Sequence, residues 1–402
     1  MTFENGSDRA AGKVDVLIVG AGPAGLMAAE VLGAAGRQVR VTDAMPSVGR
    51  KFLMAGKSGL NLTKEEPDDP FRAAFGDIPD QMTTALAAFG PREVIAWSEG
   101  LGSSVFTGST GRVFPHAMKA SPLLRAWLAR LAGLGVEVRT RWRWTGWDDA
   151  GSVFSTPQGS VRLDAEVTIF ALGGASWRRL GSTGDWAEAF RADGHAITPF
   201  QPANMGFAAR WSPHMERHFG APVKSTRLSA GPLSGRGEWV ISARGLEGGG
   251  IYEVSRAVRE GHPLALDLAP DLTVEEVAAR LSRGKAKDSM ANLLRKTLGM
   301  SPEARALLME WGRPLPAAPE DLARRIKGLE AQLAGSLPMD GAISTAGGVA
   351  WEALDGFELK SRRGSFVAGE MLDWEAPTGG YLITGCLATG RAAAEQALGL
   401  RV

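Results

Sequence analysis

The chain has 402 residues, of which 44% are hydrophobic and 22% charged, a composition typical of a globular protein with two or three domains. Its 45 basic and 44 acidic residues leave a net charge of +1, which excludes a strong overall attraction to nucleic acid or to a membrane surface. The single cysteine, Cys386, excludes an intramolecular disulfide, a redox-active cysteine pair and a cysteine zinc cluster.

The sequence also predicts the cellular location of the protein. No run of about twenty apolar residues is present, so we expect no membrane span. The N-terminal stretch MTFENGSDRAAGK is polar and lacks the apolar core of a secretory signal, which favours a cytoplasmic protein. The five histidines have no metal-ligand spacing with carboxylates or cysteine, so we predict no metal site.

The first predicted unit, residues 14–43, is a strand, a glycine turn, a helix and a second strand. Its first strand is an almost continuous apolar run and ends in G-x-G-x-x-G, the fingerprint of a dinucleotide-binding turn. The first glycine permits a tight turn, the second lets a pyrophosphate approach, and the third lets the helix pack on the strand. A carboxylate after the second strand can accept hydrogen bonds from an adenosine ribose and repels the 2′-phosphate of NADP. The cofactor-binding residues predicted here are Gly20, Gly22, Pro23, Ala24, Gly25, Asp43 and Ala44.

A loop-like segment follows at residues 46–63. It is rich in glycine and short polar residues, and it carries Arg50, Lys51, Lys57 and Asn61. Such a segment suits a position over an anionic ligand. Since this stretch alone does not choose between NAD, NADP and FAD, the identity of that ligand depends on the rest of the chain.

The next region combines helices and strands. A helix is predicted to begin near Ser121-Pro122, with serine as the cap and proline in the first turn. Residues 136–171 predict several short strands, and "RWRW" at 141–144 reads as a strand with its tryptophans on one face rather than as a nucleic-acid stacking surface. The last strand, 167–171, ends at Ala171 before Gly173-Gly174, a second glycine junction beside the nucleotide site.

We predict three parts along the chain. Residues 1–196 form the first part of an FAD-binding domain, residues 197–339 an inserted domain, and residues 340–402 the second part of the FAD-binding domain. The insert is β-rich over 197–270 and helical over 271–339, with Asp271 or Thr273 as a helix cap.

The C-terminal part decides between the dinucleotides. A short strand at 365–368 leads into Gly369-Glu370, and Thr378-Gly379-Gly380 opens a helix of small residues. This second strand, glycine and helix arrangement can hold the flavin half of FAD, and helix N–H groups can offset negative charge on the flavin ring. Because an NAD dehydrogenase has no need for such a return, we predict FAD.

Five blocks in this order carry a resemblance to a known family. They are GRKFLMAGKSGLN (49–61), GRVFPHAMKA (111–120), ALGGASW with GSTGD (171–185), TAGGV (345–349) and AGEMLDWEAPTGGY (368–381). Together with the N-terminal turn, they resemble the BaiN-like, or YhiN-like, family of NAD(P)/FAD-dependent flavoproteins, in a smaller branch. The resemblance covers most of the chain outside the insert.

The resemblance implies an α/β fold of the two-dinucleotide-binding-domain flavoprotein type, interrupted by a β-barrel-like and helical insert. It implies tightly held FAD and reduction of carbon–carbon double bonds in steroid-like or nucleobase substrates. Arg50 and Lys51 would lie near the pyrophosphate or ribose. Glu370, with Asp373 as a second candidate, would be the acid near the ribityl or pyrophosphate. The remaining cofactor residues that it implies are Asn61, Ala171, Gly173, Gly174, Gly369, Thr378, Gly379, Gly380 and Tyr381.

One block departs from the family pattern. Where many relatives have Arg-Cys-Asn, this chain has Gly59-Leu60-Asn61, so that only the asparagine matches. A role tied to the arginine or the cysteine therefore does not transfer. The proton carriers that remain as catalytic candidates are Lys57, His116 and Tyr381. For Lys57, phosphate neutralisation is the favoured alternative, and Cys386 reads as a packed thiol.

The leading hypothesis is an FAD-dependent oxidoreductase that passes hydride from flavin N5 to an unsaturated small molecule, with NAD(P)H as the electron donor. No second G-x-G-x-x-G follows an apolar strand, so a dedicated NAD(P)H domain is not evident. One alternative is a flavoprotein that modifies uracil in RNA, in which case nucleic acid is the partner. Another is a binding protein in which FAD does not turn over. Oligomeric state is left open.

Overall fold

The computed structural model describes residues 12–399, apart from residues 58, 150 and 286. Its internal contacts divide the chain into two units, Met1–Gln201 with Ser344–Val402, and Pro202–Ile343. Each unit has its own hydrophobic core. None of the described helices has the length and apolar character needed to cross a membrane.

The first unit is built on a mainly parallel sheet with the order β21-β22-β23-β9-β1-β2-β6. Its parallel strands are β1 (Gly12–Val19), β2 (Val39–Asp43), β6 (Glu137–Thr140), β9 (Gly159–Phe170) and β23 (Ser365–Val367). In β1, the residues Val16, Leu17 and Ile18 are fully buried, as the apolar run predicts for a central strand covered on both faces. The mixed α/β fold is the one expected from the sequence.

Two antiparallel additions flank this sheet. On one side, β22 (Glu358–Leu359) and β21 (Leu354–Asp355) continue from β23. Off this strand order, β7 (Arg143–Asp148) pairs with β8 (Gly151–Thr156), and β8 pairs with the first half of β9. The "RWRW" stretch is not one strand, because Arg141 adopts a positive φ of 62° between β6 and β7.

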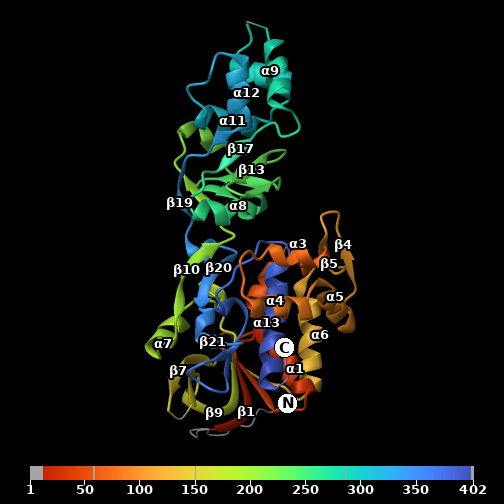
Figure 1. Cartoon of the computed structure of the whole chain (residues 1–402), viewed down its shortest axis with the longest axis vertical. Coiled ribbons are helices and arrows are strands. Elements are labelled where there is room, and N and C mark those ends of the chain that lie inside the picture. Colours follow the sequence, from red (N-terminus) through yellow and green to blue (C-terminus); the bar gives the residue numbers. More distant parts are fainter. Residues whose placement is uncertain (1–11, 58, 150, 286, 400–402) are drawn as a thin grey trace. The chain divides into compact units, whose positions relative to one another are not determined.

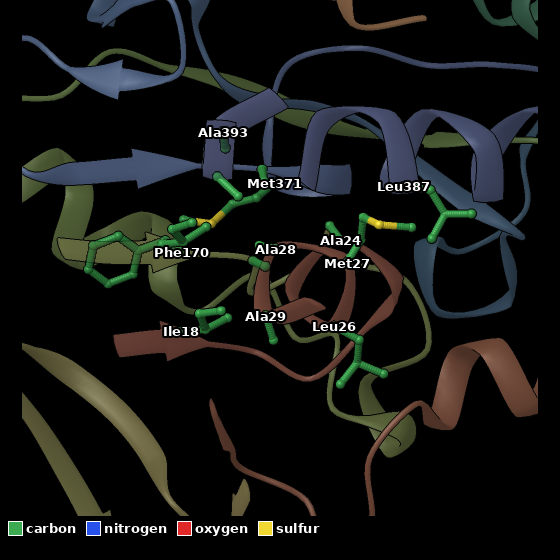
Figure 2. Packing of buried hydrophobic residues seen from close by; sticks show 14 of the residues in the cluster. Ile18, Ala24, Leu26, Met27, Ala28, Ala29, Phe170, Met371, Leu387 and Ala393 are labelled. Atoms are coloured by element: carbon green, nitrogen blue, oxygen red, sulfur yellow. The ribbon is translucent and has the colours of Figure 1, made fainter. Parts of the chain in front are cut away.

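The closing helix, α13 (Tyr381–Ala397), packs against the first helix, α1 (Pro23–Ala34) (Figure 1). A β-carbon on Gly390 would lie 2.2 Å from the carbonyl oxygen of Ala24, so the two backbones approach as closely as glycine permits. Figure 2 shows the small side chains of α1 beside Leu387 of α13, above the central strand. The two ends of the chain therefore build one core.

Shorter elements complete the first unit. A three-stranded sheet has the order β3-β5-β4, and β10 pairs with β20 where the chain leaves and re-enters this unit. The α6 helix begins at Ala120 with Lys119 at the cap position, so the prediction that Ser121 caps it is wrong by two residues. The elements are α2 (Arg50–Ala55), β3 (Thr63–Lys64), α3 (Asp68–Ala73), α4 (Asp80–Ala88), α5 (Pro91–Gly100), β4 (Val105–Thr107), β5 (Arg112–Pro115), α6 (Ala120–Gly133), α7 (Trp186–Ala192), β10 (Ile197–Ala203) and β20 (Ser344–Val349).

The second unit contains two antiparallel sheets with the orders β12-β15-β16-β11-β19 and β14-β13-β17-β18. Thr273 caps α9 and forms a capping box with Glu276, as its sequence position predicts. Strand and helix are less segregated than expected, since α8 lies among the strands and β18 and β19 follow the helices. The elements are β11 (Phe207–Ala209), β12 (Pro222–Val223), β13 (Arg227–Ala230), β14 (Leu233–Gly235), β15 (Trp239–Ser242), β16 (Gly245–Glu247), α8 (Gly249–Arg259), β17 (Ala265–Asp267), α9 (Val274–Ser282), α10 (Met290–Leu298), α11 (Pro302–Trp311), α12 (Pro319–Lys327), β18 (Leu329–Glu330) and β19 (Leu333–Ser336).

Candidate functional site

The candidate site lies at the carboxyl edge of the parallel sheet in the first unit. Because β2, β1, β9 and β23 run in the same direction, their C-terminal ends share one edge. The residues that follow or end these strands are Asp43, Gly20, Ala171 and Gly369. Ligands of open α/β sheets bind at such an edge, so the sequence-predicted glycine turns converge where a ligand is expected.

The N-terminal glycine turn is shaped by close backbone contacts. Gly20 has a φ of 109°, and a β-carbon there would lie 2.2 Å from the carbonyl oxygen of Ala171. A β-carbon on Gly25 would lie 1.9 Å from the carbonyl oxygen of Gly20. At Gly22, by contrast, no atom lies within 4 Å of that position. Gly20 and Gly25 are therefore required by the fold, whereas Gly22 leaves space for a ligand.

The start of α1 is available to an anion. Pro23 is its first residue, Gly22 occupies the cap position, and neither a side-chain cap nor an acidic residue is present in the first turn. Ala24 lies directly beyond, buried against Gly369. Free N–H groups and the helix dipole at such an end attract phosphate.

Asp43 stabilises this turn. Its carboxylate accepts hydrogen bonds from the backbone N–H groups of Ala21 (3.0 Å) and Met45 (2.8 Å). Burial raises the pKa of Asp43, and the two backbone hydrogen bonds oppose that rise. Ala44, which lies between Asp43 and Met45 in the sequence, is half-buried. Asp43 thus lies at the predicted ribose position and also ties the end of β2 to the glycine turn.

Lys51 and Glu370 meet at the centre of the edge, although they are 319 residues apart in sequence. Lys51 Nζ lies 2.6 Å from Glu370 Oε2 and donates to Ser176 Oγ at 3.2 Å. Glu370 also accepts from the backbone N–H groups of Gly174 (3.3 Å) and Thr345 (3.1 Å). This carboxylate therefore joins α2, the second glycine turn and the returning C-terminal segment.

The second acidic candidate, Asp373, has different partners. Its carboxylate accepts a hydrogen bond from Thr198 Oγ1 at 2.6 Å, and its carbonyl oxygen accepts from Trp351 Nε1 at 2.7 Å. These contacts attach the C-terminal loop to β10. Of the two candidates, Glu370 is the one in contact with the glycine turn.

The second glycine turn is braced by hydroxyl groups that the sequence reading did not single out. Thr345 Oγ1 accepts from the N–H groups of Ala175 (2.9 Å) and Ser176 (3.2 Å), and Ser182 Oγ donates to the Gly174 carbonyl at 2.9 Å. Gly173, with a φ of 74°, precedes them. Ser182 lies in the GSTGD block and Thr345 in the TAGGV block. These two blocks were the sequence signal from which both residues could have been identified.

The C-terminal glycine turn contacts the segment after α2. A β-carbon on Gly380 would lie 2.4 Å from Thr63 Cα, so only glycine fits at this position. In the orientation that satisfies its neighbours, the Asn61 amide donates to the carbonyl oxygens of Thr63 (3.0 Å) and Gly379 (3.2 Å). Thr378 immediately precedes Gly379 and is half-buried. Asn61 therefore positions the turn that opens α13.

Tyr381 points into the protein beside this turn. Its hydroxyl donates to the Glu66 carboxylate and accepts from Lys64 Nζ at 3.0 Å, and its ring stacks on Phe71 at 4.9 Å. Burial, reinforced by Glu66, raises the pKa of Tyr381 to about 12. A phenol held this way suits the positioning of α13, and its assignment as a proton carrier stays a prediction.

The other two catalytic candidates are exposed and lie in separate places. Lys57 lines a cavity of about 450 Å³ together with Arg50. His116 directly follows β5. Its ring centroid lies 5.2 Å from that of Phe106, and its backbone N–H donates to the Ser104 carbonyl oxygen. Among the described residues, no hydrogen bond, ion pair or ring contact joins Lys57, His116 and Tyr381 to one another.

The donor set fits an elongated ligand with a central pyrophosphate. Gly22 offers space, the start of α1 has no side-chain cap on its amides, and Asp43 offers carboxylate oxygens as acceptors. Arg50 Nε is buried and has no hydrogen-bond partner among the described residues, which suits an anionic ligand. Over the described part of the chain, no group of three or more histidine, cysteine and acidic side chains comes together to hold a metal.

This fold and this edge define a flavoprotein oxidoreductase of the two-dinucleotide-binding-domain type, and FAD is its cofactor. The family described as HI0933-like protein Rossmann domain matches residues 14–396, and the chain belongs to that family.

Known relatives extend along nearly the whole chain. The 3-dehydro-bile acid delta(4,6)-reductase of Clostridium scindens is 27% identical, over 94% of this chain and 98% of its own length. The ribosomal RNA dihydrouridine synthase of Escherichia coli is 22% identical, over 92% of this chain and 94% of its own. Among solved structures, the 3-ketosteroid delta1-dehydrogenase of Sterolibacterium denitrificans shares the fold with a TM-score of 0.54 and 12% identity, over 96% of this chain and 99% of its own.

Proposed function

We propose that this flavoprotein reduces a carbon–carbon double bond in an unsaturated small molecule, with NAD(P)H as the electron donor. The observation that carries the proposal is the similarity, along almost the entire chain, to a reductase of 3-dehydro-bile acids. Conjugated ketones of steroid-like shape are therefore the first substrate class to test. We place the reaction in the cytoplasm, because the single cysteine suits a reducing compartment.

The residues of the sheet edge would hold FAD in one orientation. Gly22 and the first turn of α1 would take the pyrophosphate, and Asp43 would take the adenosine ribose. Lys51, held by Glu370, would lie beside the pyrophosphate or ribityl chain. The start of α13 would border the flavin ring. When bound, FAD supplies hydride transfer between the donor and the substrate.

A proton must also reach the reduced double bond. Of the side chains assigned to this role from sequence, Tyr381 is buried with a pKa of about 12, so its phenol is a weak acid at neutral pH. His116 is exposed beside Phe106, and an imidazole is a common proton carrier in enzymes. We therefore propose His116 as the first proton carrier to replace, with His116→Asn expected to change the pH profile of turnover.

Reduction of uracil in RNA is the second candidate function. It is favoured by the similarity to the ribosomal RNA dihydrouridine synthases of Escherichia coli and Haemophilus influenzae. An exposed aromatic ring also suits a base, since Phe106 is exposed and stacks on the half-buried Phe114 with ring centroids 5.7 Å apart. Nucleic acid is a partner under this candidate alone.

One experiment separates these candidates. The purified protein is reduced without oxygen by NADH or NADPH, and reoxidation of the flavin is then followed with a conjugated ketosteroid or with a uridine-containing RNA. Faster reoxidation by the ketosteroid supports the first function, and faster reoxidation by RNA supports the second. A flavin that stays oxidised with both nicotinamides contradicts the proposed donor and favours a protein in which FAD does not turn over.

A further inference from the structure

A second binding region lies on the face of α2 that carries Arg50, Leu53 and Met54. The cavity there has a volume of about 450 Å³, which is large enough for a nucleotide. Its wall does not include Lys51, which pairs with Glu370 at the flavin site. The lining residues are Ser47, Arg50, Leu53, Met54, Gly56, Lys57, Lys119, Ala120, Ser121 and Leu180.

The polar part of this lining is made of hydrogen-bond donors and cations. Arg50, Lys57 and Lys119 contribute three positive charges, and no carboxylate is among the lining residues. No ion pair joins any of the three to an acidic residue in the described part of the chain. Arg50 donates to Ser47 Oγ at 3.2 Å, and Lys119 donates to the Lys57 carbonyl at 3.1 Å. Arg50 acts on the Asp43 carboxylate only at longer range, so three cations that form no ion pair lie in one concave site and favour an anion of more than one charge.

The start of α6 adds to this positive potential. The helix runs from Ala120 to Gly133, and both Ala120 and Ser121 line the cavity. Its first turn has no acidic residue and no side-chain cap, so the free N–H groups and the positive end of the dipole face no protein anion there. The cations and the helix end are independent features that favour the same kind of ligand.

The remaining wall is apolar. Leu53, Met54 and Leu180 line the cavity beside the three cations, so one site combines an apolar surface with a strong anion position. A ligand that contains both an aromatic ring and a phosphate monoester likewise combines an apolar part with a strongly anionic part. A dianionic monoester also matches three cations better than the single charge of a phosphodiester.

We propose that this cavity binds the adenosine 2′-phosphate end of NADPH. The three cations and the α6 amides hold the 2′-phosphate, and the apolar wall contacts the adenine. This inference rests on the proposed function, in which a nicotinamide reduces the flavin, and it selects NADPH over NADH. It also explains how a donor can be recognised although the sequence carries no second dinucleotide fingerprint.

The test uses the full-length, FAD-loaded protein and two probes, adenosine 2′,5′-bisphosphate and adenosine 5′-monophosphate. Calorimetry is expected to show the bisphosphate binding at least about tenfold more tightly, as one or two charge-assisted hydrogen bonds provide. Lys119→Gln is expected to reduce that preference to about threefold or less. The matched control is Arg125→Gln, an exposed cation on the same helix but outside the cavity, which should retain the wild-type preference.

Several outcomes would overturn the assignment. Equal affinity of the wild-type protein for the two probes would do so. A Lys119→Gln variant that keeps the full preference for the bisphosphate, or that has the same preference as Arg125→Gln, would do so as well. Displacement of the bisphosphate by a short RNA at lower concentration than by NADPH would assign the cavity to RNA instead. If the bisphosphate binds through Lys119 but neither nicotinamide reduces the flavin, the phosphate site stands and the proposed donor falls.

Discussion

At the residue scale, Glu370 is the side chain on which the proposed flavin site depends most. It accepts hydrogen bonds from Gly174 and Thr345 and pairs with Lys51, so a single carboxylate holds three segments in register. Two of its partners are backbone donors, which an amide side chain cannot satisfy with both of its polar atoms.

Glu370→Gln is therefore expected to raise the dissociation constant for FAD about tenfold or more, since a hydrogen bond to a charged group contributes about 1.5–3 kcal/mol. Titration of the apoprotein with FAD, followed by flavin fluorescence, measures this change. Asp373→Asn separates the two acidic candidates, because Asp373 binds Thr198 instead. A larger loss of affinity in Asp373→Asn than in Glu370→Gln would reverse our assignment.

Tyr381 leads to a prediction about pH. The chain has two tyrosines, and burial raises the pKa of both Tyr252 and Tyr381, the latter to about 12. A raised pKa means that the folded state keeps the phenolic proton more tightly than the unfolded state. The stability that this provides is present below pH 10 and is lost as the pH rises from 10 to about 12.

In Tyr381→Phe, ring stacking on Phe71 is retained and the hydroxyl is removed. Unfolding midpoints measured between pH 10 and 12 should fall less steeply in this variant than in the wild-type protein. An ultraviolet titration should lose the higher phenolate step while the Tyr252 step remains. Tyr381 titrating at its ordinary pKa near 10 would contradict the buried arrangement.

The reactivity of Cys386 gives a further prediction, because its thiol is affected by the charges of Glu370 and Lys51. Burial raises the pKa of its thiol to about 12, the charge of Glu370 adds to the rise, and Lys51 opposes it. Although the side chain is only half-buried, its thiolate fraction is thus lowered relative to an ordinary cysteine. We expect iodoacetamide to label the native protein far more slowly than the denatured chain, in which one thiol per molecule should react. Equal rates in the two states would show that the thiol is open to solvent.

At the scale of elements, the contact between α1 and α13 makes the two ends of the chain into one domain. The contact is possible because both helices present small residues, with Ala24 facing Gly390. Close approach of the helices brings the middle of α13 to the edge of the sheet, where Gly369 lies against both Ala24 and Cys386.

Gly390→Ala is expected to lower the free energy of unfolding by about 1–3 kcal/mol, because its methyl group would overlap the Ala24 backbone. The matched control is Gly133→Ala at the end of α6, where nothing lies within 4 Å of the added carbon. That change should be neutral or stabilising by up to about 1 kcal/mol. Chemical denaturation of both variants measures the difference, and equal effects would mean that α13 can shift away from α1.

The elements also show how far sequence patterns reach. β1, α1, β2 and α13 were predicted from apolar runs and glycine positions, because those signals are local. β9 was predicted as five residues and extends over Gly159–Phe170, since its first half is held by the antiparallel hairpin with β8 and its second half by β1. The start of α6 was misplaced because the serine and proline that suggest a cap lie inside the first turn.

At the scale of the whole molecule, the two units have separate cores, and the residues proposed to hold FAD all belong to the first unit. A ligand that binds only the folded state stabilises it by about 2.7 kcal/mol when present at a hundred times its dissociation constant. FAD should therefore stabilise the first unit alone.

Calorimetry of the apoprotein and the FAD-loaded protein should show one transition that rises by about 5–10 °C with FAD and a second that does not move. A single transition that shifts as a whole would show that the two units unfold together. A protein whose transitions ignore FAD would contradict the proposed site.

Features that depend on neighbouring residues could be predicted from the amino-acid sequence. These are the buried parallel strand, the tight turn at Gly20, the acid that ends β2 and the glycine opening of α13. Only the tertiary structure decided which of two acids meets Lys51, that Tyr381 is turned inward, and that Arg50, Lys57 and Lys119 surround one cavity. The reason is physical: a local pattern sets the backbone and the buried face of one element. Contacts between residues hundreds of positions apart depend instead on strand order and helix packing, which no short stretch of sequence encodes.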